Sequence, residues 1–133
     1  MEVQGREALE PDQRTVQYRL TEALWSRLVE QGVRDGSQGQ IEGFLFAPDE
    51  TAAAAVAASY VNNGWLREVD QLEDGSGRLR IKLVSKPVYL TRQALLELAD
   101  VMMVSARHHG CAFDGFQIAV SAVRPPRPWW RFW

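Results

Sequence analysis

The chain has 133 residues, of which 46% are hydrophobic and 24% charged, a composition typical of one globular domain with a single core. The net charge is −2, but residues 123–133 hold three Arg and no acid, so the rest has 12 basic and 17 acidic residues, which argues against nonspecific nucleic-acid binding. The lone Cys111 permits no intramolecular disulfide, and the chain shows neither a signal peptide nor an apolar run near the roughly 20 residues of a membrane-spanning helix, so we expect a soluble protein of a reducing cytoplasm.

The first predicted helix follows a short polar segment. Residues 1–11 are expected to form a flexible leader that ends at Pro11. The next segment, VQYRLTEALWSRLVEQG, has apolar residues at helical spacing: Val16, Leu20, Leu24 and Leu28. Gly32 is expected to end this helix, and residues 33–40 are expected to form a linker because they are rich in Gly, Asp and Ser.

A strand and a second helix are predicted next. Residues 40–47, QIEGFLFA, alternate well enough to indicate a strand. The segment Pro48-Asp49-Glu50 favours a helix start, since Pro suits a first turn and acids complement the positive end of the helix dipole. The Ala-rich helix over residues 51–64 is expected to end at Gly64 and to lie close to a sheet.

A β-hairpin and a third helix follow. Residues 65–72 and 78–86 flank the turn-rich EDGSG and are predicted to pair, with apolar side chains on one side of the second strand and Arg80 and Lys82 on the other. Thr91 is the predicted N-cap of a helix that Gly110 ends.

The last strand is predicted over residues 111–122. After the first helix the element order is β-α-β-β-α-β, which is the order of a ferredoxin-like α+β sandwich. We therefore expect one domain over residues 12–122, with a four-stranded antiparallel sheet, two helices on one face and an additional N-terminal helix. Residues 123–133 are expected to form a Pro/Arg/Trp-rich tail.

The Asp114-Gly115 pair lies inside the last strand. Asp-Gly is ordinarily a hairpin signal, but no further strand follows here, so a β-bulge at Gly115 is the favoured interpretation. In that interpretation the Asp114 carboxylate bonds nearby backbone donors, and Phe113 and Phe116 fill core on opposite sides of the strand. The alternative is that Asp114 and Gly115 form a recognition point near a sheet edge.

With this order in place, several segments carry a family resemblance. They are VEQGVRDGS, an Ala-rich helix ending in NNGW, the hairpin LEDGSGRLRIKLVSK, and LLELADVMMVSARHHG leading into AFDGFQI. From about Leu28 to Val120 the chain resembles the family of the regulator of ribonuclease E activity B, RraB, a ferredoxin-like family of bacterial cytoplasm. The family typically has Tyr-Asp-Gly-Trp where this chain has Phe-Asp-Gly-Phe.

The resemblance implies a protein-binding inhibitor and not an enzyme. Members of the family bind ribonuclease E outside its catalytic core and restrain RNA processing by altering the degradation assembly. Those members are strongly acidic, often with an acidic tail, whereas this chain is mildly acidic and ends in VRPPRPWWRFW. We therefore expect its contacts with a basic partner segment to differ.

Neither a metal site nor a catalytic site is expected. The residues His108, His109, Cys111 and Asp114 are all possible ligand types, but their spacing matches no paired zinc pattern, and His at a helix C-terminus is explained by the helix dipole. The chain has no nucleophile elbow and no phosphate-binding loop. We expect no cofactor.

One sheet face carries the main alternative function. If Ile41 and Leu45 point inward, Phe44 and Phe46 share the other face with Arg80 and Lys82. Aromatic and basic side chains on one face are the arrangement that an RNA-binding ferredoxin-like sheet uses for stacking and phosphate contacts. The competing interpretation, which we favour, is that the N-terminal helix covers this face through Leu20, Leu24 and Leu28.

The tail RPPRPWWRFW has three open interpretations. Trp and Arg are enriched in protein interfaces, so Trp129 and Trp130 are candidate anchors for a partner. Alternatively, the tail folds back over the sheet and buries its own Trp side chains. A membrane-interface role also suits Trp and Arg, although the tail is too short to span a bilayer.

The sequence therefore predicts a regulatory protein-binding module. Its expected partner is ribonuclease E or its degradation assembly, with no direct nucleic-acid contact, and the chain itself is expected to be a monomer or a weak homodimer. The predicted partner-binding residues are Phe44, Phe46, Arg80, Lys82, Asp114, Phe116, Trp129 and Trp130.

Overall fold

A computed structural model of the chain describes residues 11–72 and 75–126. Within them, the helices are α2 (Pro11–Glu30), α3 (Glu50–Asn62) and α4 (Arg92–His108), and the strands are β1 (Ser37–Gly39), β2 (Ile41–Ala47), β3 (Leu66–Gln71), β4 (Leu79–Val84), β5 (Val88–Leu90) and β6 (Ala112–Ile118), followed by the 3-10 helix η1 (Val120–Ala122). The protein is thus a mixed α+β domain with two antiparallel sheets, which confirms the predicted α+β class. None of the described helices is long and apolar enough to cross a membrane.

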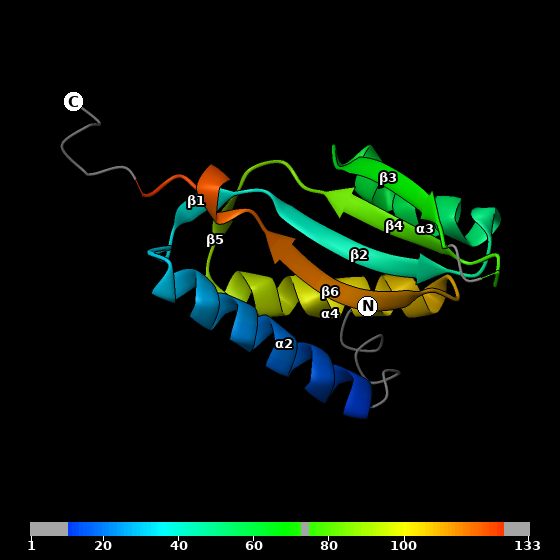
Figure 1. Cartoon of the computed structure of the whole chain (residues 1–133), viewed down its shortest axis with the longest axis horizontal. Helices are drawn as coiled ribbons and strands as arrows, with labels where there is room; N and C mark the ends of the chain where they lie inside the picture. Colours follow the sequence, from blue (N-terminus) through cyan, green and yellow to red (C-terminus); the bar gives the residue numbers. More distant parts are fainter. Residues whose placement is uncertain (1–10, 73–74, 127–133) are drawn as a thin grey trace.

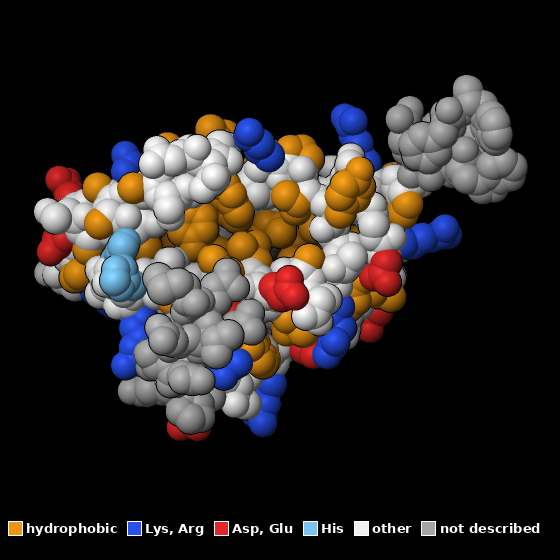
Figure 2. Space-filling view, turned by 180° about the vertical axis from the view of Figure 1, so that it is seen from behind, with side chains coloured by type: hydrophobic (Ala, Val, Ile, Leu, Met, Phe, Trp, Pro, Cys, Tyr) orange, Lys and Arg blue, Asp and Glu red, His pale blue; other side chains and the backbone are white. Residues whose placement is uncertain are grey.

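The larger sheet has the strand order β3-β4-β2-β6, and every neighbouring pair in it is antiparallel (Figure 1). Apolar side chains alternate along the strands and point to one face, where α3 and α4 pack on them. In the view from behind, hydrophobic side chains gather in a hollow near the middle of this side (Figure 2). The buried core between this sheet face and the helices includes Leu45, Val56, Tyr60, Ile81, Leu83, Met102, Met103 and Phe113.

The helix ends follow the predicted local signals. The Asp49 carboxylate accepts a hydrogen bond from the N–H of Ala52 at 2.8 Å, and the Thr91 hydroxyl accepts one from the N–H of Ala94 at 3.0 Å, so each caps its helix. Such caps typically contribute about 1 kcal/mol each. The three glycines expected to end the helices all follow them within two residues and have positive φ: Gly32, Gly64 and Gly110.

A second, two-stranded sheet was not predicted. It pairs β1 with β5, and Gln38 of β1 also exchanges two backbone hydrogen bonds with Arg124, at 2.8 and 2.7 Å. Residues 33–40 are therefore not only a linker, and the segment after residue 122 is tied to the domain as far as Arg124. The predicted last strand ends early, at Ile118, because η1 turns the chain toward this small sheet.

The N-terminal helix does not lie where we expected. α2 packs beside α4 and along β6, on the same side of the larger sheet as the other helices (Figure 1). Leu24 and Leu28 are buried there against Ile41 and Ile118, whereas Leu20 is 50% exposed. The prediction that α2 covers the opposite sheet face is wrong, because Leu24 and Leu28 pack into the core on the helix side. The buried stripe of α2 consists of Gln17, Thr21, Leu24 and Leu28, and it leaves Leu20 outside.

Candidate functional site

The sheet face turned away from α3 and α4 brings together four of the predicted residues. In the register of β2 and β4, Phe44 lies opposite Lys82 and Phe46 lies opposite Arg80, so the four side chains share one face as the alternation predicted. We call this surface the distal face. It is formed by Glu42, Phe44 and Phe46 of β2, Leu66, Glu68 and Asp70 of β3, and Arg80, Lys82 and Val84 of β4.

Two arginines cover the aromatic rings of the distal face. The guanidinium carbon of Arg80 lies 4.3 Å from the ring centroid of Phe44, and the guanidinium of Arg78 lies 5.8 Å from that of Phe46. Phe44 is only 9% exposed although it points away from the helices. Exposed cation–π contacts of this kind contribute about 0.5–1 kcal/mol. One side of each ring is therefore occupied by a cation.

The lysine of the distal face is flanked by acids. The Nζ of Lys82 lies 3.7 Å from a carboxylate oxygen of Glu42 and 3.4 Å from one of Glu68. These partly exposed pairs contribute little stability, at most about 1 kcal/mol each. Their effect on recognition is larger, because a lysine between two carboxylates attracts a phosphate less strongly than a lone lysine does. The nine residues of the distal face include three acids and two bases, and Arg78 over the Phe46 ring adds a third base.

The contribution of β3 to this surface was missed in the sequence. Leu66, Glu68 and Asp70 lie opposite Val84, Lys82 and Arg80 in the hairpin register. All residues of β3 are exposed, and Leu66 is 66% exposed. The alternation in LREVDQ, combined with the predicted hairpin, would have placed these side chains beside Arg80 and Lys82.

β6 contains the predicted bulge, at Asp114. Phe44 pairs with Gly115 and Leu45 pairs with Phe113, so Asp114 is the extra residue, and Gly115 has a φ of 125° that favours glycine. The extra residue changes the alternation. Phe113 and Phe116 therefore both point toward the helices, with ring centroids 4.9 Å apart.

Two expectations for β6 are thus wrong. Phe113 and Phe116 do not lie on opposite sides of the strand, since Phe116 packs against the core on the helix side. The Asp114 side chain is exposed, and no backbone N–H among the described residues donates to its carboxylate. Of the two predicted partner-binding residues in β6, Asp114 is exposed and Phe116 is only partly buried, on the helix side of the sheet.

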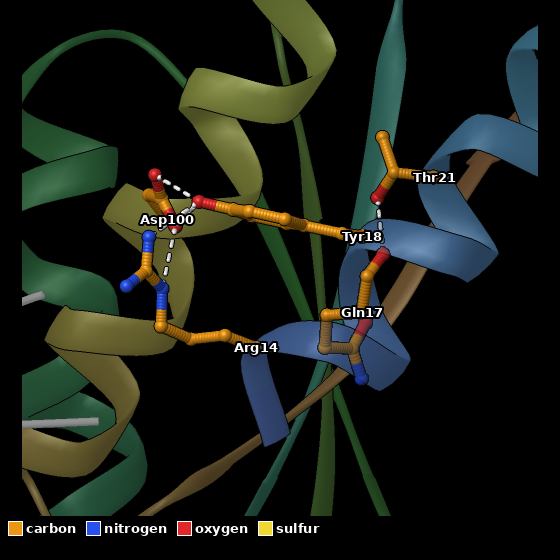
Figure 3. Close-up of polar contacts among 5 residues, drawn as sticks. All are labelled: Arg14, Gln17, Tyr18, Thr21 and Asp100. Atoms are coloured by element: carbon orange, nitrogen blue, oxygen red, sulfur yellow. Dashed lines mark hydrogen bonds and ion pairs between the residues drawn. The ribbon is translucent and has the colours of Figure 1, made fainter. Parts of the chain in front are cut away.

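A buried polar cluster attaches α2 to α4 (Figure 3). Asp100 of α4 is only 5% exposed, and the Tyr18 hydroxyl donates to its carboxylate oxygens at 2.6 and 2.7 Å. Arg14 adds an ion pair to Asp100 at 3.8 Å and donates to the Tyr18 hydroxyl at 2.8 Å, which raises the pKa of Arg14. We assign this cluster a structural role, because it fixes α2 against α4.

The sequence reasoning missed this cluster. Its signal was an acid within the apolar run LADVMM, at a helix position where the neighbouring residues are core residues. A buried carboxylate needs a donor or a cation, and these come from a helix 82 positions away in the chain. Sequence spacing alone therefore could not show which residues would meet Asp100.

The residues considered for a metal site are His108, His109, Cys111 and Asp114. The rings of His108 and His109 are tilted by 46°, and the Cys111 thiol donates toward the carbonyl oxygen of Ala52 in α3. Burial, with a smaller contribution from Asp49, raises the pKa of Cys111. No group of three or more His, Cys, Asp or Glu side chains within residues 11–72 and 75–126 is arranged to hold a metal ion.

The last two predicted residues, Trp129 and Trp130, lie outside the described residues. Compared with known proteins, the chain matches no protein-family model, and no curated protein sequence matches it. The RraB resemblance therefore stays a hypothesis based on the segments quoted above.

Proposed function

We propose that this protein is a regulatory module that acts by binding another protein through the distal face of its sheet. The resemblance to the RraB family makes ribonuclease E, in the region outside its catalytic core, the partner to test first. In this proposal binding modulates RNA decay by changing the degradation assembly, and the chain itself carries out no chemistry.

The observation that carries the proposal is that the Phe44 ring and the lysine of the distal face already contact other side chains of this protein. Arg80 lies on the Phe44 ring, and Lys82 lies between Glu42 and Glu68. An RNA-binding sheet needs free aromatic faces for stacking and unpaired cations for phosphate contacts. A protein partner needs instead a surface of mixed charges around partly buried aromatic rings, which this face provides.

We further propose that the unit from β2 to β6 is a ferredoxin-like domain. The strand order β3-β4-β2-β6 supports this assignment, as does a core that gathers α3 and α4 against one sheet face. In this view α2 and the small β1–β5 sheet are additions to the fold. They extend its helix side and leave the distal face free for a partner.

The proposal is tested by binding to the noncatalytic region of ribonuclease E, after nuclease treatment to remove RNA. The test variant is Phe46→Ser with Arg80→Ser, and the matched control is Val29→Ser with Arg19→Ser on the exposed surface of α2. We expect the distal-face variant to bind at least about tenfold more weakly and the control to bind normally. Equal binding by both variants, or binding to RNA alone with a steep salt dependence, contradicts the proposal.

The predicted tail anchors are tested by truncation after Pro126. This cut removes Trp129 and Trp130 but keeps the backbone pairing of Arg124 with Gln38, so the domain stays intact. If the two Trp residues contact the partner, the truncated chain binds ribonuclease E more weakly at unchanged thermal stability. Unchanged binding restricts the interface to the distal face.

A further inference from the structure

The β3 strand is an uncovered edge of the larger sheet. Among the strands of the described residues it pairs only with β4, and all six of its residues are exposed. At the opposite edge α2 packs along β6, where the Gln17 side chain donates to the carbonyl oxygen of Phe113 at 3.3 Å. In Figure 1 no described element lies beyond β3. Its outer row of backbone N–H and C=O groups is therefore free to pair with another strand.

Side chains on the distal face alternate in charge across the strands toward this edge. Lys82 of β4 lies opposite Glu68 of β3, and Arg80 lies opposite Asp70. Because β3 is the last strand on this side within the described residues, no strand there places side chains opposite Glu68 and Asp70 on its outer edge. Opposite charges directly across neighbouring strands stabilise a sheet, so basic side chains are favoured at those two places.

The remaining positions of β3 favour apolar partners. Leu66 lies at the end of the same row and is 66% exposed. On the helix side, Val69 of β3 is 40% exposed, and Val61 near the end of α3 is 44% exposed where α3 packs on β3. Side chains of an added strand opposite Leu66 and Val69 would bury this apolar surface.

We propose that the β3 edge accepts an extended segment of another protein as a fifth, antiparallel strand. Read from its N-terminus, the segment has a basic residue opposite Asp70, an apolar residue opposite Val69, a basic residue opposite Glu68, any residue, and an apolar residue opposite Leu66. β4 pairs with β3 in this way already, through Arg80, Ile81, Lys82, Leu83 and Val84. Backbone pairing supplies affinity, and alternate side chains supply specificity.

A second copy of this chain fits the edge poorly. Directly opposed residues of antiparallel strands point to the same face, so only some registers keep the sheet continuous. The two such registers with the greatest overlap of β3 with itself place Glu68 opposite Glu68 or opposite Asp70. Like charges in these positions are destabilising, so the proposed occupant is a basic segment of a different protein.

This inference rests on the proposed role in protein binding but not on ribonuclease E as the partner. A defined peptide can therefore test it separately. The probe is a labelled synthetic peptide with the sequence of residues 78–86, RLRIKLVSK, which contains the required pattern. Its affinity for the full-length protein is measured at physiological ionic strength.

The first arm tests charge. We expect the Glu68→Lys, Asp70→Lys variant to bind the peptide about tenfold or more weakly, and a peptide with Arg80→Glu and Lys82→Glu to bind this variant better than it binds the parent protein. The matched control, Glu30→Lys with Asp35→Lys, reverses two exposed acids away from the sheet and should bind normally. Equal loss in the control, or no loss in the β3 variant, overturns the proposal.

The second arm tests backbone pairing. Two peptides are N-methylated on alternate backbone nitrogens, one set for each side of the strand. Only one set of N–H groups can point toward β3, so we expect one methylated peptide to lose binding and the other to keep it. Equal binding by both peptides indicates attraction by charge alone and overturns the proposal, whatever the outcome with ribonuclease E.

Discussion

The two edges of the larger sheet differ in how they are protected. The β6 edge is covered by α2 and interrupted by a bulge at Asp114, whereas at the β3 edge the described part of the chain provides neither a covering helix nor a bulge. At β3 the charges of Glu68 and Asp70 oppose pairing with a second copy. The comparison shows that a covering helix closes an edge to all partners, whereas a charge pattern closes it only to some.

The largest expected effect comes from loosening the covered edge. Asp100→Ala removes the carboxylate that Tyr18 and Arg14 contact, so the Tyr18 hydroxyl loses its acceptor and the partly buried Arg14 guanidinium loses its ion pair. We expect a loss of about 3 kcal/mol in the free energy of unfolding, measured in urea. Tyr18→Phe keeps the ion pair and should cost about 1 kcal/mol. Equal, small losses in both variants would show that the cluster does not hold α2 in place.

The bulge in β6 should give the next largest effect. Gly115 has a φ of 125°, and a Cβ added there would meet no atom within 4 Å, so Gly115→Ala adds backbone strain alone. We expect a loss of about 1–3 kcal/mol in thermal or urea unfolding. Gln117→Ala, two residues further along the same strand, is the control and should be near neutral. A neutral Gly115→Ala variant would mean that the strand adopts another register in solution.

A smaller effect is expected on the distal face. Arg80→Ala removes the cation from the Phe44 ring and should lower stability by about 0.5–1 kcal/mol. The exposed ring should then bind a hydrophobic dye or stack with nucleotides more readily. Arg67→Ala, on the other face of β3, is the control. Equal responses of the two variants would show that Arg80 does not shield Phe44.

The smallest effect concerns pH. Glu22 of α2 accepts hydrogen bonds from Arg92 at the start of α4, and this contact lowers the pKa of Glu22 below its ordinary value. A lowered pKa in the folded state contributes stability that is present at neutral pH and is lost as the pH falls through that pKa. Glu22→Gln should therefore be slightly less stable than the parent protein at pH 7 and equal to it at strongly acidic pH. A constant difference across this range would contradict the assignment.

Local features of the fold could be predicted from the sequence, and distant pairings could not. Asp49, Thr91 and Gly110 act within a few residues of themselves, so their signals identified the helix ends. The small sheet joins residues near 38, 89 and 124 through three-residue strands, which are too short to show a period. The packing of α2 was mispredicted because the apolar Leu20 was expected to be buried. In the structure the polar Thr21 is buried instead, and Leu20 is exposed.

The candidate site shows the same division. Alternation in β2 and β4 correctly placed Phe44, Phe46, Arg80 and Lys82 on one face. Phe116 was misplaced because the bulge, although predicted, shifts every later side chain in β6 to the other face. Whether the chosen residues contact a partner stays a prediction.

Amide hydrogen exchange at the two sheet edges, with and without the RLRIKLVSK peptide, tests the account most directly. We predict that alternate amides of β3 exchange quickly in the free protein and become protected when the peptide is bound, while those of β6 do not change. Protection that appears in β6 or α2 instead, or in neither edge while the peptide is bound, would contradict it.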